Sequence, residues 1–82
     1  MISLIVVKEA GSLFDEPALE GEEHRLVVAL RRLIGERASR VYRNTHDQFI
    51  VVFPAPGYLR SEDYNAINGL DPGKVRVVTT GI

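Results

Sequence analysis

Two short runs of consecutive apolar residues stand out along the chain. Residues 2–7 (ISLIVV) and 48–53 (QFIVVF) are rich in β-branched and aromatic side chains and show little alternation with polar ones. Runs of this kind are typical of central strands that are covered on both faces. We therefore predict two central strands, and we expect the second to end at Pro54 because proline cannot extend a central ladder.

Two further segments show the patterning of outer strands. Residues 39–43 (SRVYR) alternate in part and carry arginines, which protect an edge strand from further pairing. Residues 74–80 (KVRVVTT) follow the turn signal 71–73 (DPG) and form the last predicted strand. The turn formers 44–47 (NTHD) separate 39–43 from 48–53, so these two strands are expected to be antiparallel neighbours.

Two segments are predicted to be helical. From residue 22 to about residue 37, apolar residues recur at three- and four-residue spacing and form one stripe: Leu26, Val27, Ala29, Leu30, Leu33 and Ile34. The start is acidic and the end is basic, as the helix macrodipole favours: Glu20, Glu22 and Glu23 against Arg31, Arg32 and Arg37. Ser61 is expected to cap a shorter helix over 62–68, which ends at Gly69 and has Tyr64 and Ile67 facing inward.

The order of these elements is β-α-β-β-α-β, within one domain that spans residues 1–82. Its simplest compact arrangement is the ferredoxin-like α+β fold, a four-stranded antiparallel sheet with two helices on one face. Right-handed crossovers place 2–7 and 48–53 in the centre of the sheet. Residues 8–21, which contain Gly11, Pro17 and other turn formers, are expected to be a loop.

Both central strands carry apolar residues on both faces, although two helices can cover only one face. The two sets are Leu4, Val6, Phe49, Val51 and Phe53 on one face, and Ile5, Val7, Ile50 and Val52 on the other. The uncovered set would form an apolar patch of a size that is rare in monomers. We therefore expect a two-fold homodimer through the open sheet face. In the alternative, the loop 8–21 folds over that face.

The composition limits the classes of function. A chain of 82 residues with 45% apolar content holds one small core and little room for a deep pocket. Ten basic and eleven acidic residues give a net charge of −1, so the positive field expected of a nucleic-acid binder is missing. The same balance gives no support for binding to a membrane surface or to an acidic substrate. Eight of the ten basic residues are arginine, which suggests a thermophilic or GC-rich source.

The absence of cysteine excludes a disulfide framework, a thiolate zinc site and a cysteine nucleophile, and it agrees with a cytoplasmic location. The opening MISLIVV is too short for a signal peptide or a membrane span, so we expect no membrane association.

The polar run 43–48 (RNTHDQ) is the main candidate for chemistry. His46 and Asp47 are adjacent, as in metal-binding phosphohydrolases with a His-Asp signature, and His24 is the candidate additional histidine. The pair could also act as a general base, although no partner serine is identified. In the alternative, Asn44 and Asp47 make a hairpin turn, His46 points to solvent, and His24 is a surface residue.

The same stretch resembles the signature hairpin of the GGDEF family, the diguanylate cyclase domains, which reads approximately R-y-G-G-D-E-F before an apolar strand that ends in proline. Residues 43–54 (RNTHDQFIVVFP) align with it without a gap and keep Arg43, Asp47, Phe49 and Pro54. The order of elements and the final VTTGI, similar to the family's v-S-i-G-i, extend the resemblance over most of the chain. It implies a nucleotide as ligand, bound by residues at the hairpin: Arg43, Asn44, Thr45, His46, Asp47 and Gln48.

The chain departs from that family where catalysis needs particular residues. Thr45 and His46 replace the two glycines that let the backbone approach phosphates, and Gln48 replaces the glutamate. The stretch 7–10 (VKEA) replaces the aspartate at the end of the first strand, which leaves Glu9 as its substitute. The family's inhibitory R-x-x-D site falls on Glu36 and Ser39 and is absent. Two-metal phosphoryl chemistry needs several converging carboxylates, so the resemblance implies the fold without the catalyst, a cofactor or a metal.

We therefore expect a non-catalytic interaction or regulatory module, homodimeric, with a nucleotide as the candidate ligand near Arg43 and the 44–48 turn. One alternative is a magnesium-dependent nucleotidyl cyclase or transferase that uses carboxylates of this chain: Asp47, Glu9 and Asp15. A further alternative is a ferredoxin-like RNA-binding module that stacks bases on Phe49 and Phe53, and the net charge argues against it.

Overall fold

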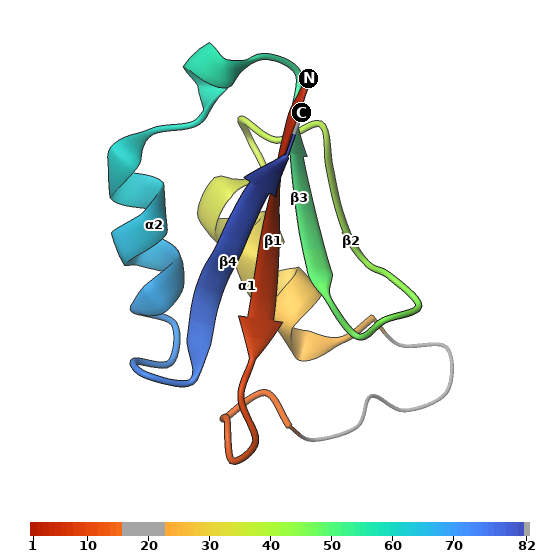
Figure 1. The fold of residues 1–82 in the computed structure, drawn as a ribbon, viewed down its shortest axis with the longest axis vertical. Coiled ribbons are helices and arrows are strands. Elements are labelled where there is room, and N and C mark those ends of the chain that lie inside the picture. Colours follow the sequence, from red (N-terminus) through yellow and green to blue (C-terminus); the bar gives the residue numbers. More distant parts are fainter. Residues whose placement is uncertain (16–22, 82) are drawn as a thin grey trace.

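The computed structural model describes residues 1–15 and 23–81, with the side chains of residues 79–81 outside the description. The elements are, in chain order, β1 (Ile2–Lys8), α1 (Arg25–Ile34), β2 (Arg40–Arg43), β3 (Phe49–Phe53), the short 3₁₀ helix η1 (Pro56–Tyr58), α2 (Ser61–Asn68) and β4 (Val75–Gly81). They form one antiparallel sheet with two helices packed against it (Figure 1). The predicted ferredoxin-like βαββαβ arrangement is confirmed.

The strand order is β2-β3-β1-β4, so the two continuous apolar runs occupy the centre, as predicted. The register of β1 and β3 pairs Ile2 with Phe53 and Val6 with Phe49. On the other side of β1, Val6 pairs with Val77 whereas Ile5 pairs with Thr79. Val78 is therefore an extra residue in β4, and it forms a β-bulge there.

The core lies between the sheet and the two helices. Alternate residues of the central strands point into it and are fully buried: Leu4, Val6, Phe49, Val51 and Phe53. From the helices, Leu26, Leu30 and Ile67 meet them, also with no exposed surface. Burial of one such side chain contributes about 1.5–3 kcal/mol, so this layer is a major stabilising part of the fold.

Helix α1 is shorter at both ends than predicted. It begins at Arg25 because the side chain of His24 accepts a hydrogen bond from the Leu26 N–H and caps the first turn. At the other end, the N–H of the cap residue Gly35 donates to the Arg31 carbonyl oxygen at 2.7 Å, and the chain then turns.

The acidic start of α1 was predicted wrongly. Glu23 precedes the cap, and no acidic side chain lies in the first turn, whereas the basic last turn is confirmed by Arg31 and Arg32. The Glu23 carboxylate instead accepts two hydrogen bonds from Arg31, at 2.5 and 2.6 Å. Glu20 and Glu22 lie outside the described residues.

Helix α2 is capped by a different residue from the one predicted. Arg60 occupies the cap position and Ser61 is the first helical residue. The carboxylate of Asp63 accepts a hydrogen bond from the Arg60 N–H at 2.8 Å, so the cap is made from inside the helix. Ile67 is buried and Tyr64 packs partly buried against the core, as predicted.

The Asp63 carboxylate also joins α2 to the turn after α1. Arg37 donates to its two oxygens at 2.7 and 2.6 Å, and the same guanidinium donates to the Tyr58 carbonyl oxygen at 3.0 Å. The hydrogen bonds from Arg37 lower the pKa of Asp63, although its burial acts in the opposite direction. Arg37 thus joins the turn after α1 to two segments more than twenty residues further along the chain, η1 and α2.

No helix within 1–15 and 23–81 has the length and apolar character needed to cross a bilayer.

We predict that Asp63→Asn lowers the free energy of unfolding by about 2–3 kcal/mol, because it leaves Arg37 without a carboxylate at a largely buried position. Urea denaturation followed by circular dichroism measures this change. Glu62→Gln is the matched control: the Glu62 carboxylate is exposed and lies 3.9 Å from Arg60, so we expect a change within about 0.5 kcal/mol. Equal effects of the two substitutions would contradict the role assigned to Asp63.

Candidate functional site

The candidate residues gather at one end of the sheet. Since Val6 pairs with Phe49, the β2–β3 hairpin loop lies beside the end of β1 at Lys8 (Figure 1). The start of α1 is at the same end, since the ring of its cap residue His24 lies 4.8 Å from the ring of Phe49 at the start of β3. We call this region, which comprises Lys8, Asp15, His24 and the hairpin residues 43–49, the hairpin end.

The hairpin loop is held by its own side chains. The Asn44 Oδ1 accepts hydrogen bonds from the His46 N–H at 2.9 Å and from the Gln48 N–H at 3.0 Å. The Asn44 Nδ2 also donates to the Gln48 Oε1 at 2.9 Å. Asp47 has φ 60, the left-handed conformation that often completes a three-residue hairpin loop. Asn44 and Asp47 therefore make the turn, and Thr45 and His46 are exposed, as the turn interpretation predicts.

Asp47 is paired with Arg43 rather than free to bind a metal. The Arg43 Nε donates to Asp47 Oδ1 at 2.7 Å, and a second guanidinium nitrogen donates to the same oxygen. The two side chains are 46% and 55% exposed, respectively. An ion pair this exposed to water is worth about 0–1 kcal/mol, so a competing anion can displace it at low cost.

The other two candidate metal-binding carboxylates are paired as well. Glu9 lies 2.9 Å from Arg76 of β4. Asp15 accepts hydrogen bonds from Lys8 at 2.7 Å and from the Gly11 N–H at 2.6 Å, and these contacts lower the pKa of Asp15. In the part of the chain that the structure describes, no three His, Asp or Glu side chains form a group that could hold a metal ion.

His24 was predicted to lie on the surface, and this was wrong. The residue is only 8% exposed, its Nδ1 accepts the Leu26 N–H at 3.0 Å, and its ring lies 4.8 Å from the ring of Phe49. Its burial lowers the pKa of the imidazole, and the positive charges of Arg43 and Lys8 lower it further. The position just before a helical apolar run was the signal in the sequence, since a neutral histidine can accept a hydrogen bond as Asn or Asp does.

The two phenylalanines of the RNA-binding alternative are not available to a ligand. Phe49 and Phe53 are fully buried under the helices. Neither ring can stack on a base without loss of the core, so that alternative lacks its aromatic platform.

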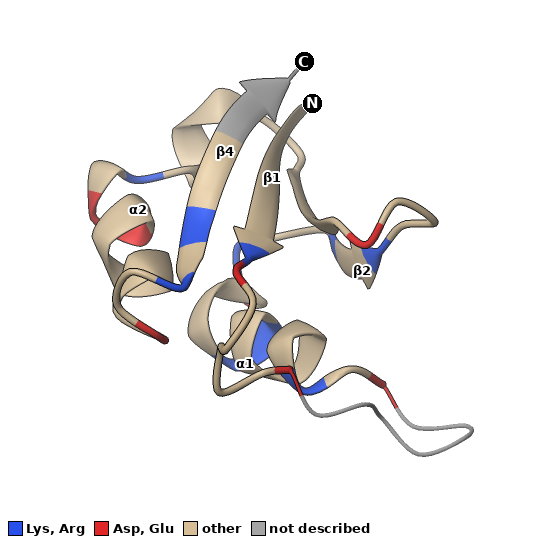
Figure 2. Cartoon of the chain, turned by 60° about the horizontal axis from the view of Figure 1, so that its bottom comes forward, with Lys and Arg blue, Asp and Glu red and all other residues tan. Residues whose placement is uncertain are grey.

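Acidic and basic residues lie next to one another at the hairpin end (Figure 2). Each anion there has a cation within contact distance, so the region has no field of a single sign to attract a highly charged ligand from a distance.

The fold and the hairpin end define a small ferredoxin-like α+β protein whose candidate ligand residues are held by one another. Comparison of the chain with protein-family models, with curated proteins and with solved structures finds no significant match. The resemblance to the GGDEF family stays a prediction from the sequence.

We predict that the free energy of unfolding falls as the pH drops below about 6.5, the ordinary pKa of histidine. The fall continues until the pH reaches the pKa of His24 in the folded protein, which is lower. The unfolded chain takes up a proton first in this window, and protonated His24 cannot accept the Leu26 N–H. Urea denaturation at a series of pH values measures the loss. His24→Asn keeps a capping oxygen that does not titrate, so its stability should be nearly constant across the window. His46→Asn, at the exposed histidine, should leave the loss in place, and an unchanged loss in His24→Asn would contradict the prediction.

Proposed function

We propose that the chain is a non-catalytic interaction or regulatory module that forms a homodimer through the open sheet face. The lack of catalysis is supported by the pairing of every candidate metal-binding carboxylate with a cation of the same chain: Glu9 with Arg76, Asp15 with Lys8, and Asp47 with Arg43. A magnesium-dependent nucleotidyl enzyme would have to break all three pairs and bring the carboxylates together around hard cations.

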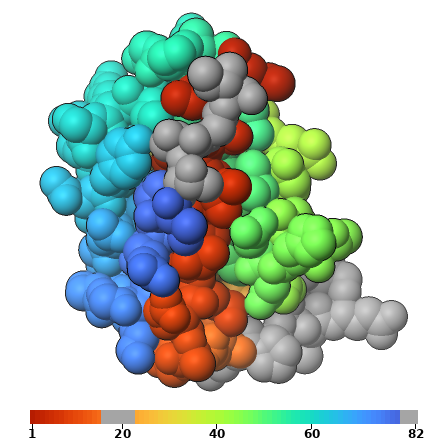
Figure 3. Space-filling view, in the orientation of Figure 1, coloured from red at the N-terminus to blue at the C-terminus, as the bar shows by residue number. Residues whose placement is uncertain are grey.

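The dimer is supported by the sheet face opposite the helices. The register pairs Ile5 of β1 with Ile50 of β3 on this face, where Val52 lies opposite Ser3, and the alternation along β1 puts Val7 on the same face. No described helix covers it (Figure 3). On the β2 side, the Arg40 guanidinium lies 4.1 Å from the centre of the Tyr42 ring. An apolar centre flanked by tyrosine and arginine has the composition common in protein interfaces.

The size of this face indicates how strong the dimer is. Four strands spaced about 4.8 Å apart, with β1 seven residues long, give a face of roughly 20 by 20 Å. Its area of about 400 Å² per protomer is half the roughly 800 Å² per partner of a standard interface. The four apolar side chains also shield one another, and Ile50 is only 7% exposed. We therefore propose a weak dimer whose population depends on protein concentration.

We predict a mass that rises from 9.1 kDa towards twice that value with increasing concentration, as measured by light scattering or sedimentation. Val52→Glu should keep the protein monomeric, because it puts a charge on the open face that the dimer would bury. Leu33→Glu is the matched control on the helix side, where Leu33 is 39% exposed, and it should dimerise as the wild type does. A wild-type monomer at all concentrations would overturn the dimer.

The candidate ligand of this module is a nucleotide, with a phosphate at Arg43. Planar guanidinium groups bind phosphate oxygens in pairs, and Arg43 is nearly half exposed. A phosphate must displace Asp47 to reach it. The exposed Arg43–Asp47 pair then acts as a competitor that weakens binding, whereas Asn44 and Gln48 are used by the turn itself.

We predict that Asp47→Asn raises the affinity for GTP, ATP or a cyclic dinucleotide by up to about five-fold, because it removes that competitor. Asparagine tolerates the left-handed conformation of residue 47, so the turn is preserved. The measurement is the rise in melting temperature with nucleotide concentration.

Arg43→Ala should abolish the rise in both backgrounds. If no nucleotide stabilises either the wild type or Asp47→Asn, the ligand part of the proposal fails and the dimer is unaffected. The same samples, incubated with labelled nucleotide and magnesium, should show no turnover, and turnover by the wild type would overturn the non-catalytic assignment.

A further inference from the structure

Two basic side chains of the hairpin end lie close to the same buried ring, that of Phe49. The centre of the His24 imidazole lies 4.8 Å from the centre of this ring, and the guanidinium carbon of Arg43 lies 5.9 Å from it. His24 is only 8% exposed, whereas the Arg43 side chain is 46% exposed. A proton on His24 and an anion at Arg43 are therefore close enough to interact, although Arg43 is far more open to a ligand than His24 is.

Charged groups from the neighbouring elements surround His24. They are Lys8 at the end of β1, Asp15 in the loop that follows, Arg43 of β2 and Asp47 of the hairpin loop. Lys8 is paired with Asp15 at 2.7 Å, and its side chain is only 15% exposed. Of the two cations, Arg43 is thus the one that an incoming anion can reach.

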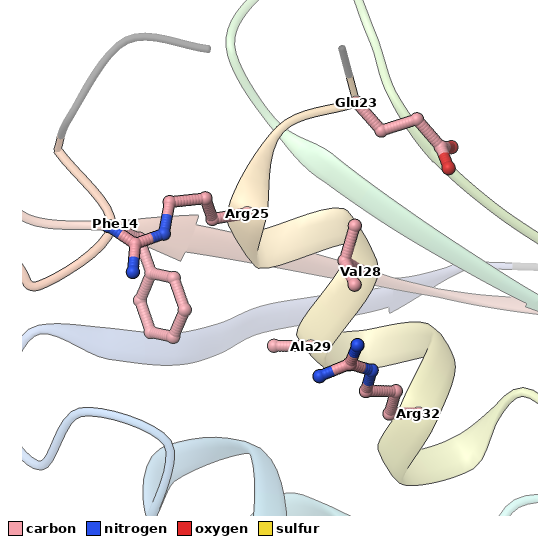
Figure 4. Close-up of a pocket in the computed structure, with 6 residues that line it drawn as sticks. All are labelled: Phe14, Glu23, Arg25, Val28, Ala29 and Arg32. Carbon is pink, nitrogen blue, oxygen red and sulfur yellow. The ribbon is translucent and has the colours of Figure 1, made fainter.

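The chain neighbours of His24 do not offer a second place for an anion. They are Glu23 and Arg25, which have opposite charges and whose side chains point in different directions (Figure 4). Both line a shallow depression of about 530 Å³ on the outer side of α1. Because a carboxylate borders this depression, an anion gains less there than at Arg43.

The charge at Arg43 and the proton on His24 oppose each other. Burial lowers the pKa of His24, and the positive charges of Arg43 and Lys8 lower it further. An anion bound to Arg43 offsets the guanidinium charge, so it should raise the pKa of His24 towards the ordinary value of histidine. Coupling between two binding equilibria is reciprocal, and protonated His24 must therefore hold the anion more tightly.

We propose that the hairpin end is a proton-linked anion site, in which protonation of His24 and binding of the phosphate group of a nucleotide to Arg43 strengthen each other. Neutral His24 caps α1 in the free protein, and a proton on Nδ1 breaks that hydrogen bond. The bound anion offsets part of this cost, so the module holds its ligand more tightly in acid. The inference rests on the phosphate position proposed above.

The test uses His46→Asn as the parent protein, because His46 lies in the same loop and would also gain charge in acid. His24 is then the only histidine of the chain. Inorganic sulfate is the probe, since it keeps its double negative charge where a phosphate monoester titrates, near about pH 6. Its affinity is measured from amide chemical shifts at about pH 5 and about pH 7.5, with ionic strength held constant by chloride.

The parent should bind sulfate about two- to five-fold more tightly at the lower pH. Adding His24→Asn should remove this difference, and adding Arg43→Ala should abolish binding. Arg60→Ala is the matched control, because it removes a 61% exposed arginine at the start of α2, far from the hairpin (Figure 1), and it should behave as the parent does. The imidazole resonances of the parent should also show a higher pKa of His24 in sulfate than in chloride, which tests the linkage with His24 in place.

The outcomes separate the linkage from the phosphate position. Sulfate that binds equally at both pH values, or that leaves the pKa of His24 unchanged, would overturn the linkage and leave the anion site at Arg43 intact. A pH dependence that persists after His24→Asn would do the same. Absence of binding at both pH values would overturn the phosphate position and the linkage together.

Discussion

Two helices can cover only one face of a four-stranded sheet, and the main features of this protein follow from that limit. The residues of β1 and β3 alternate between a face that forms the core with α1 and α2 and a face that no described helix covers. Both sets are apolar, so the sheet is built as though it were covered on both sides. Helix α1 also buries only one of its faces against the sheet. Its opposite face, which is partly apolar, remains outside the core.

The fold could be predicted because its strongest signals are continuous and local. The apolar runs at 2–7 and 48–53 mark the two strands that need neighbours on both sides, and the structure places them in the centre. The ends of the helices could not be predicted as well. Asp63 accepts a hydrogen bond from the first turn of α2 and also from Arg37, which is far away in the sequence. The capping residue is therefore determined in part by a tertiary contact, which a local sequence pattern cannot predict. His24 likewise owes its burial to the ring of Phe49.

The candidate site shows the same division between local and distant effects. The hairpin turn follows from Asn44 and Asp47, whose side chains bond to the backbone within a few residues. The pairing of Glu9 with Arg76 depends instead on the register of β1 against β4. The carboxylates could therefore be recognised as candidates in the sequence, whereas the pairing of Glu9 with a cation of β4 became visible only with the sheet assembled.

The bulge in β4 has a consequence for how copies of the chain can meet. β4 is the longer of the two edge strands, and a regular edge of this length can pair with a strand of another molecule and extend the sheet without limit. The extra residue Val78 interrupts the spacing of its backbone groups and increases the local twist. At the opposite edge, β2 has only four residues and an arginine at each end. Growth of the sheet by the pairing of strands from different molecules is thus discouraged at both edges.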